Sequence, residues 1–379
     1  MNVAHFTDSF HPRVGGVEIH VDSIVRSIPD VDFTVITDAI RGTKREERYA
    51  TNCLIKRFGP PGITTKFGNK ILFPERVLAA IKRHEKKLAW VGETKPDLLH
   101  VHGFGIAMDT LKADGLIGSK LFSSKISFKA VGTPKLLTMH GLFNFSKAPD
   151  SFVLFQDKIM AEFDNIICVD RAIKTYALKM RPSADVNYIP NFIDTDKFSY
   201  VNVPPIEMLR IAYIGRPDPL RGFDVVKELA ANLPAGIELT LVLASEGGKK
   251  MDVPTSKGVR ILWDLSQDEV CNLLGSVDVV LNPLRIPVAS RVALEAMARG
   301  RVVITSKNAD NHPVEHGETG LLFDGTLPSL LNLTQEVKEG KNDFARIGRN
   351  ARAAVEREFS YEVVIPKLRN IYEKVVKTG

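Results

Sequence analysis

Cysteine is scarce in this chain: its 379 residues include only three, Cys53, Cys168 and Cys271, which lie far apart in the sequence. No two of them have the spacing of a metal site, and an odd number cannot form a complete set of disulfides. We therefore expect the chain to reside in a reducing compartment, the cytoplasm.

Long apolar runs are also absent, since no stretch approaches the roughly 20 apolar residues of a membrane-spanning helix. Asp8, His11 and Arg13 interrupt the apolar segment that a secretory signal peptide would need. Hydrophobic residues make up 44% of the chain and charged residues 25%, which is ordinary for a globular protein. The length is sufficient for two domains with large cores.

The net charge of +6 comes entirely from residues 1–200, and much of it gathers in one segment that begins at Lys66 and ends at Trp90. The segment has seven basic residues against two glutamates. One interpretation is a peripheral patch that docks on an anionic membrane surface, and the other is a solvated helix with its apolar stripe in the core. Nucleic acid is not an expected partner, because no aromatic stacking platform accompanies the charge.

Short apolar strands alternate with amphipathic helices along the chain, which predicts an α/β fold of parallel sheets with helices on both faces. Strands are expected at residues 2–6, 33–37, 54–58, 97–102, 135–139, 165–169, 210–215, 238–244, 259–263, 277–282 and 302–305. Helices are expected at residues 17–28, 74–91, 107–116, 151–162, 171–180, 223–233, 267–274, 289–299 and 358–376. The proline-rich segment 201–209 is the expected linker, so the predicted domains are 1–200 and 201–357, followed by a terminal helix in 358–379.

Residues 277–305 form the most informative part of the chain, a predicted β-α-β unit in which Ser290 caps the helix. A helix that begins at the carboxyl edge of a parallel sheet offers free N–H groups and the positive end of its dipole to an anion such as a phosphate. Arg291 adds a cation beside the helix start. Glu295 lies one turn further on, where it could accept hydrogen bonds from sugar hydroxyls; the alternative is a solvated helix carboxylate.

Six segments carry a family resemblance: HPRVGGVEIHV, PDLLHVHG, LLTMHG, YIPNFIDTDKF, IAYIGRPDPLRGFDVV and the 277–322 region. In this order they resemble the family 4 glycosyltransferases over nearly the whole chain. The resemblance implies a GT-B architecture of two facing Rossmann-like domains, with a terminal helix that crosses back to the first domain. It also implies retaining transfer of a sugar from a nucleotide diphosphate sugar to an acceptor lipid or glycan.

Breaking the bond to a nucleotide diphosphate develops negative charge, which fixed cations can neutralise. Arg216 and Arg221 are the candidates in the second domain, and Arg221 stands where the family usually has a lysine. In the first domain the pair Gly15 and Gly16 lets the backbone approach a phosphate or sugar closely, and it permits a positive φ. By resemblance, His140 contacts the transferred sugar.

One departure concerns the family's pair of glutamates eight positions apart, because counting back from Glu295 reaches Pro287. A catalytically impaired sugar-nucleotide binder is therefore one alternative, and a sugar-nucleotide epimerase on the same fold is another. No metal is expected: Asp30/Asp32 and Asp194/Asp196 are short acidic pairs of a kind that is common by chance, and no histidine cluster is expected to support them.

Overall fold

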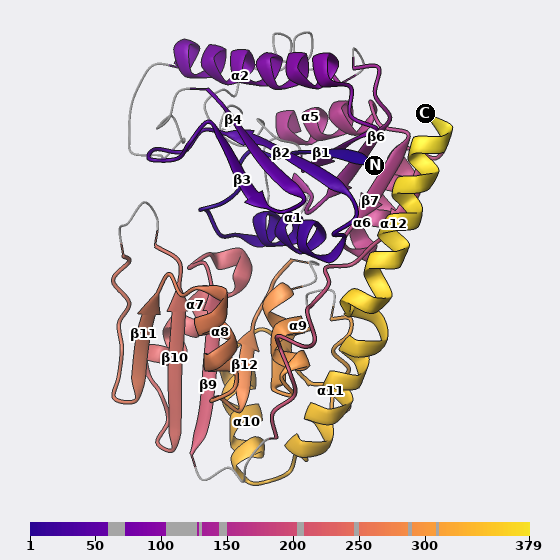
Figure 1. Ribbon diagram of the computed structural model, residues 1–379. Coiled ribbons are helices and arrows are strands. Elements are labelled where there is room, and N and C mark those ends of the chain that lie inside the picture. The colour runs from indigo at the N-terminus through magenta and orange to yellow at the C-terminus, as the bar shows by residue number, and fades with distance from the viewer. Residues whose placement is uncertain are drawn as a thin grey trace. The chain divides into compact units, whose positions relative to one another are not determined.

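A computed structural model describes residues 1–59, 73–103, 127–128, 131–143, 150–202, 208–245, 250–286, 290–307 and 311–379. These residues form two compact units, drawn in Figure 1. Unit 1 comprises Met1–Ile189 and Ile365–Gly379, and unit 2 comprises Pro190–Val364.

Unit 1 contains an eight-stranded sheet in the order β3-β4-β2-β1-β5-β6-β7-β8. All neighbouring strands are parallel except β3, which pairs antiparallel with β4. The strands are β1 Asn2–Phe6, β2 Asp32–Asp38, β3 Glu46–Ala50, β4 Cys53–Phe58, β5 Leu98–His102, β6 Lys135–Met139, β7 Asn165–Cys168 and β8 Asp185–Tyr188. The described helices of this unit are α1 Gly16–Ser27, α2 Phe73–Thr94, α5 Asp150–Met160, α6 Arg171–Met180 and the later part of α12 Tyr361–Thr378.

The two faces of this sheet differ in chemistry because side chains alternate along each strand. One face is apolar: Phe6 of β1 and Val101 of β5 join a buried core with residues of α2, α5 and α6. On the other face, β1 and β5 place histidines, which lie near α1 and α12. Figure 1 shows α2 and α5 on one side of the sheet and α1 on the other.

The terminal part of α12 belongs to unit 1. Tyr372 is fully buried, and its hydroxyl lies 2.7 Å from Nδ1 of His100 in β5. Arg369 pairs with Asp30, and Lys374 pairs with Asp185 at 2.9 Å. The expectation that the terminal helix returns to the first domain is therefore confirmed.

Unit 2 contains a parallel six-stranded sheet in the order β11-β10-β9-β12-β13-β14. Its strands are β9 Leu209–Gly215, β10 Ile237–Leu243, β11 Val259–Trp263, β12 Val279–Asn282, β13 Val302–Ser306 and β14 Leu321–Phe323. Its described helices are η2 Pro219–Arg221, α7 Phe223–Ala231, α8 Gln267–Leu274, α9 Arg291–Ala298, α10 Leu327–Lys338 and α11 Phe344–Phe359. Helices α7 and α10 share one buried core and α8 and α9 the other, so both faces of the sheet are covered.

The predicted α/β class with two parallel sheets is confirmed, and the strands and helices expected from the sequence lie within a few residues of their observed positions where they are described. The helix expected at residues 107–116 falls outside the described residues, as does most of the 201–209 linker. Six elements have no counterpart among the sequence-based expectations: β3, β8, β14, η2, α10 and α11. Among the described residues, no helix combines the length and apolarity needed to cross a membrane.

Candidate functional site

The sheet of unit 2 reverses its winding direction between β9 and β12. The chain runs outward from β9 through β10 to β11, and it then returns to place β12 on the other side of β9. Loops that leave two such strands diverge and open a crevice at the carboxyl edge, where open α/β sheets bind ligands. The loop after β9 carries Arg216 and Arg221, and the loop after β12 leads to Ser290 and Arg291. The fold therefore brings both groups of predicted residues to one edge of the sheet.

Gly222 holds these two loops against each other. It has a φ of 68°, and a Cβ at this position would lie 2.0 Å from the carbonyl oxygen of Pro283. The backbone N–H of Arg285 donates to the carbonyl of Leu220 at 3.0 Å, and the Arg285 side chain pairs with Asp224. Only glycine satisfies both the left-handed backbone and this close approach.

Arg216 and Arg221 are two cations held near each other. Arg216 is exposed, whereas Arg221 is half-buried, and burial together with the positive charge of Arg216 lowers the pKa of Arg221. Neither guanidinium forms an ion pair with a described carboxylate. Asp218, the nearest acidic residue in the loop, uses its Oδ1 to accept the backbone N–H of Leu220 at 2.8 Å and so caps η2. An anion that contacted both arginines would relieve their repulsion.

The start of α9 agrees with the predicted cap. Ser290 is the N-cap residue, and its hydroxyl accepts the backbone N–H of Ala293 at 3.3 Å. Other N–H groups of the first turn have no partner within the helix itself, which is the basis of an anion site.

Arg291, expected as a cation beside the helix start, forms an ion pair within α9. Its Nε lies 3.2 Å from Oε1 of Glu295, and both side chains are at most 10% exposed. Burial raises the pKa of Glu295, while Arg291 and a hydrogen bond from Gln267 act in the opposite direction. The alternative of a solvated carboxylate at Glu295 is therefore wrong. A contact between Glu295 and a ribose stays a prediction, and so does the position of Pro287, which lies outside the described residues.

Gly15 and Gly16 open α1 in unit 1. Gly15 is the N-cap residue with a φ of −164°, and Gly16 is not among the residues of positive φ, so neither glycine uses the left-handed region that the sequence suggested. A Cβ on Gly15 would meet the Glu18 carboxylate at 2.5 Å, whereas a Cβ on Gly16 would meet nothing within 4 Å. The helix consequently begins without a side-chain cap, and open space lies beside Gly16.

His140 follows β6 and belongs to a cluster of five histidines. His5 and His100 are register partners in β1 and β5, and His102 lies two residues further along the same face of β5. His20 of α1 lies over them, with its ring 4.8 Å from that of His140 between centroids. Four of these side chains are buried and His140 is half-buried.

Hydrogen bonds join three of these rings in a row. His5 Nδ1 lies 2.7 Å from His102 Nε2, and His102 Nδ1 lies 3.2 Å from His140 Nε2. Burial lowers the pKa of His5 to about 3 and that of His140 to about 4. Burial and the neighbouring imidazoles also hold the pKa of His102 well below its usual value. All three rings are therefore neutral at neutral pH.

The sequence does not predict this histidine cluster, because its members come from separate elements. The pairing of β1 with β5 and of β5 with β6 brings four of the histidines together, and α1 supplies His20. The alternation in LLHVHG was the available signal, since it places His100 and His102 on one face of a strand. The acidic pairs, in contrast, have structural partners: Asp194 Oδ1 accepts the N–H groups of Asp196 and Lys197, and Asp30 pairs with Arg369.

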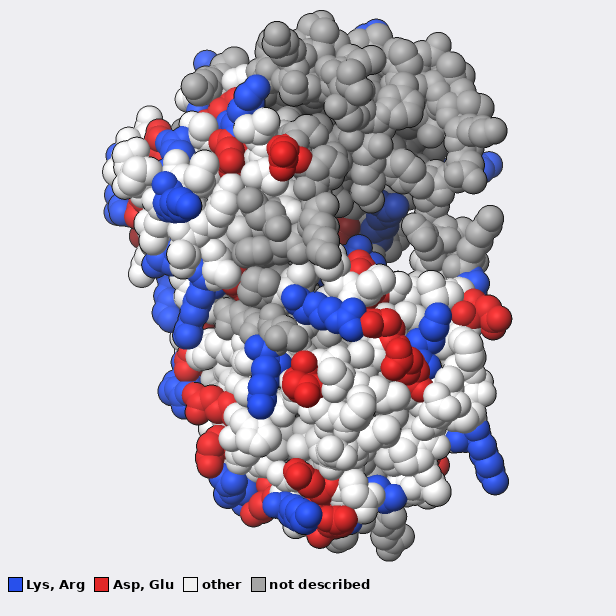
Figure 2. All heavy atoms as spheres, turned by 180° about the vertical axis from the view of Figure 1, so that it is seen from behind, with Lys and Arg blue, Asp and Glu red and all other residues white. Residues whose placement is uncertain are grey.

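The basic segment 66–90 is described from residue 73 onward, where it forms most of α2. Arg83 and Lys87 are buried, and both pair with Asp38, at 3.2 and 2.5 Å. Only Lys82 and Lys86 of the four central cations are exposed. Figure 2 shows basic and acidic side chains interspersed over the described residues of the face drawn. Two of the four cations are thus held inside the unit, and docking of the exposed pair on a membrane stays a prediction.

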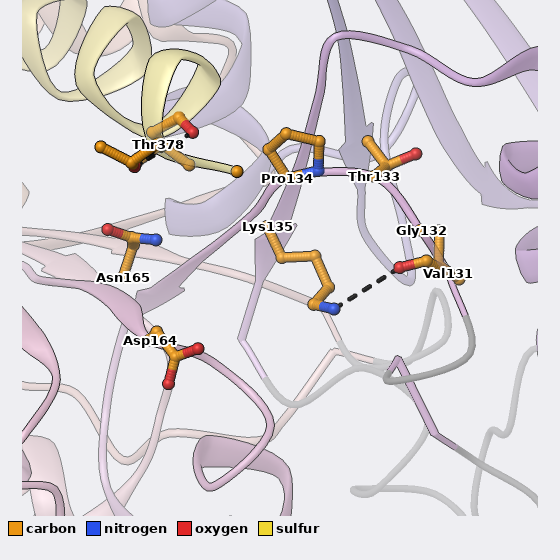
Figure 3. Close-up of a pocket in the computed structure, with 10 residues that line it drawn as sticks. Val131, Gly132, Thr133, Pro134, Lys135, Asp164, Asn165 and Thr378 are labelled. Carbon is orange, nitrogen blue, oxygen red and sulfur yellow. Dashed lines mark hydrogen bonds between the residues drawn. The ribbon is translucent and has the colours of Figure 1, made fainter.

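A pocket of about 470 Å³ lies elsewhere in unit 1 and is shown in Figure 3. Its lining includes Lys135 at the start of β6, Asn165 at the start of β7 and Thr378 near the end of α12. It therefore lies at the amino edge of the sheet, whereas His102 and His140 lie at the carboxyl edge. Since ligands of such sheets bind at the carboxyl edge, we do not assign the donor to this pocket.

In comparison with known proteins, each of the two units matches a glycosyltransferase profile. Residues 14–197 match the profile of Glycosyltransferase Family 4, and residues 209–334 match that of Glycosyl transferases group 1. The chain is 21% identical to one component of human phosphatidylinositol N-acetylglucosaminyltransferase, with 99% of this chain and 76% of the relative covered. It is 23% identical to an uncharacterized glycosyltransferase of Methanocaldococcus jannaschii, with 97% of this chain and 96% of the relative covered.

Solved structures show the same fold. Sucrose-phosphate synthase from Thermosynechococcus elongatus superposes with a TM-score of 0.77 at 17% identity, and both chains are fully covered. The Anabaena protein HepE, crystallised with UDP and glucose, gives a TM-score of 0.70 at 16% identity, with 99% of this chain and 100% of the other covered. The profiles, the relatives and the GT-B architecture agree, and the chain belongs to family 4 of the glycosyltransferases.

Proposed function

We propose that this glycosyltransferase binds a nucleotide diphosphate sugar at the switch point of unit 2 and transfers the sugar with retention of configuration. The observation that carries the proposal is the pair of arginines, Arg216 and Arg221, which lie near each other without a described carboxylate partner. Two cations without an ion pair to a described carboxylate at the carboxyl edge of a sheet suit a diphosphate, which carries negative charge on both phosphoryl groups.

The diphosphate would contact the two guanidiniums and the backbone N–H groups that follow Ser290. No divalent cation is needed on the diphosphate in this arrangement, because fixed positive charge already faces the leaving group. We keep Glu295 as the proposed contact of the ribose and His140 as the proposed contact of the transferred sugar. Gly15 and Gly16 would allow the backbone at the start of α1 to approach the substrate.

In the reaction, the bond between the anomeric carbon and the diphosphate oxygen breaks, and the acceptor oxygen bonds to the same carbon. The acceptor's hydroxyl proton passes to the departing diphosphate. Retention by double displacement would need a carboxylate nucleophile on the opposite face of the sugar. The described hydrogen-bond and ring partners of His140 are two imidazoles, those of His102 and His20, and not carboxylates, which supports attack on the leaving-group side.

We further propose a lipid acceptor at the cytoplasmic face of a membrane, with the protein bound peripherally. Support comes from the human relative, whose name assigns it to phosphatidylinositol. The exposed Lys82 and Lys86 of α2 would supply part of the attraction to anionic lipid.

A thermal-shift panel of uridine, guanosine and adenosine diphosphate sugars tests donor binding. A ligand at about 100 times its dissociation constant adds roughly 2.7 kcal/mol to the stability of the folded state. Stabilisation by one base and transfer to a phosphatidylinositol acceptor would support the proposal, and the absence of stabilisation by any nucleotide sugar would contradict it.

Two alternative functions are distinguishable when binding of the nucleotide sugar is measured together with conversion of the sugar. Pro287, in the place of the family's first glutamate, favours a binder without turnover, which would be stabilised by a nucleotide sugar and transfer nothing to any acceptor. An epimerase would convert the donor sugar in the absence of an acceptor.

A further inference from the structure

The histidine cluster of unit 1 brings three ring nitrogens from different elements close together. His20, His102 and His140 each offer one ring nitrogen, and these three atoms lie within 4.8 Å of one another. They come from α1, the end of β5 and the residue after β6, which are elements of a single unit. We propose that these three histidines bind a transition-metal ion of the Zn²⁺ class.

The distances suit such an ion. Tetrahedral zinc binds imidazole nitrogens at about 2.0–2.1 Å, so two nitrogens on one ion lie roughly 3.4 Å apart. His102 Nδ1 and His140 Nε2 are already 3.2 Å apart. The separations from His20 are at most 4.8 Å, so its ring nitrogen would have to approach the other two by up to about 1.4 Å to share one ion with them.

The surroundings of the ligands fit the same assignment. A metal-bound histidine usually donates its second ring N–H to an acceptor that fixes its orientation. If His102 binds through Nδ1, its Nε2–H donates to Nδ1 of His5 at 2.7 Å. His5 is fully buried between the strands and therefore acts as a positioning residue for the ligand His102.

The donor set selects the class of ion. Three neutral imidazoles suit Zn²⁺, Co²⁺, Ni²⁺ or Cu²⁺, whereas Mg²⁺ and Ca²⁺ prefer oxygen ligands, and none of the three ligand positions is a carboxylate. Three protein ligands leave a fourth position, and His140, the half-buried member, marks the side that is open to solvent.

A consequence for activity rests on the proposed function. An ion on Nε2 of His140 occupies the side chain that we assigned to the transferred sugar. Bound Zn²⁺ should therefore inhibit transfer, although none of its three ligands is a proposed contact of the diphosphate. The site would make the enzyme sensitive to free zinc.

Titration of the untagged full-length protein with Co²⁺ tests the site without reference to activity. We expect one Co²⁺ per chain, with the visible absorption of a tetrahedral site, and displacement by Zn²⁺. His20→Asn and His140→Asn should each weaken Co²⁺ binding about 100-fold, and circular dichroism checks that both variants fold. The control His316→Gln alters an exposed histidine of unit 2 and should bind Co²⁺ as the wild type does. Absence of the tetrahedral absorption, or its persistence in both folded cluster variants, would overturn the proposal.

A second arm separates the site from the proposed function. His20→Asn retains His140, so it should stay active and lose inhibition by Zn²⁺, and a chelator should restore the zinc-inhibited wild type. Stoichiometric Co²⁺ binding in a chain that transfers no sugar would support the metal site and contradict the proposed function. Metal binding with uninhibited transfer would support the site and overturn the assignment of His140 to the sugar.

Discussion

Gly222 approaches Pro283 so closely that a Cβ on the glycine would lie 2.0 Å from the proline's carbonyl oxygen. This contact joins the loop after β9 to the loop after β12, the two loops that carry the candidate donor site. The glycine of the Arg221-Gly222 pair is thus needed for the shape of the site, whereas Arg221 supplies its charge.

Gly222→Ala is expected to destabilise unit 2 and to weaken donor binding, because both the backbone conformation and the contact become unfavourable. A non-glycine residue at positive φ costs roughly 1–3 kcal/mol, and the clash adds to that. Urea unfolding and donor titration measure the two effects. The matched control is Gly340→Ala, since Gly340 has a φ of 70° with nothing within 4 Å of its Cβ position. Equal losses of stability in the two variants would show that the Pro283 contact has no energetic effect.

Arg216→Ala should weaken binding of the nucleotide sugar and slow transfer, because one of the two cations facing the diphosphate is lost. Hydrogen bonds to charged groups contribute about 1.5–3 kcal/mol, so the dissociation constant should rise about 10- to 150-fold. Isothermal titration with the donor and with the free nucleoside diphosphate measures this change. Arg260→Ala, which removes an exposed arginine of β11, is the control. Unchanged donor affinity in Arg216→Ala would exclude this side chain from the site.

The strands that the sequence predicted well are those whose burial leaves an apolar run. β1 and β6 begin and end at the predicted residues, and in each strand every residue after the first is buried. β3 was missed because its sequence EERYA is polar and forms an exposed antiparallel edge strand. The hydrophobic periodicity of a sequence reflects the burial of its side chains. A polar edge strand such as β3 buries few of them and therefore shows little periodicity.

The parts of the candidate site that depend on local sequence were predictable. The cap at Ser290 and the arginines after β9 lie in single loops, and short motifs describe them. The pair of Arg291 with Glu295 was also within reach, since residues four apart on a helix are neighbours. The histidine cluster was not, because it depends on which strands pair, and that pairing is set by the packing of the whole unit.

His84 should make the stability of unit 1 depend on pH. Its ring is buried against Phe6 and Phe128, neither ring nitrogen has a partner among the described residues, and burial, then the positive charge of Lys87, lowers its pKa to about 3. Lys87 in turn pairs with Asp38 of β2. The folded pKa lies below the unfolded value of 6.5, so the stabilising difference is complete above pH 6.5 and is lost as the pH falls toward 3.

The loss attributable to His84 should approach about 1.4 kcal/mol for each pH unit below 6.5. Urea unfolding of the wild type and of His84→Leu at pH 7 and pH 5 measures it, and the leucine variant should show the smaller decrease. His11→Gln, at an exposed histidine of the same unit, should follow the wild type. Parallel decreases in the wild type and the leucine variant would mean that His84 titrates equally in the folded and unfolded states.

Lys82 and Lys86 are the described cations of α2 that remain available to a membrane, because Arg83 and Lys87 are buried against Asp38. The double variant Lys82→Gln/Lys86→Gln should retain the fold and bind less strongly to vesicles that contain anionic lipid. Each basic residue near such a surface contributes about 1 kcal/mol, so the partition coefficient should fall about 30-fold at low salt, and less at high salt.

Vesicle cosedimentation measures this fall, with Lys179→Gln on α6 as a control for the loss of an exposed positive charge. Substitution of Arg83 or Lys87 is unsuitable for this purpose, because either change would leave Asp38 with a single buried partner and alter stability as well as charge. If the double variant and the wild type sediment equally with anionic vesicles, the exposed face of α2 is a solvated surface and the acceptor membrane must be contacted elsewhere.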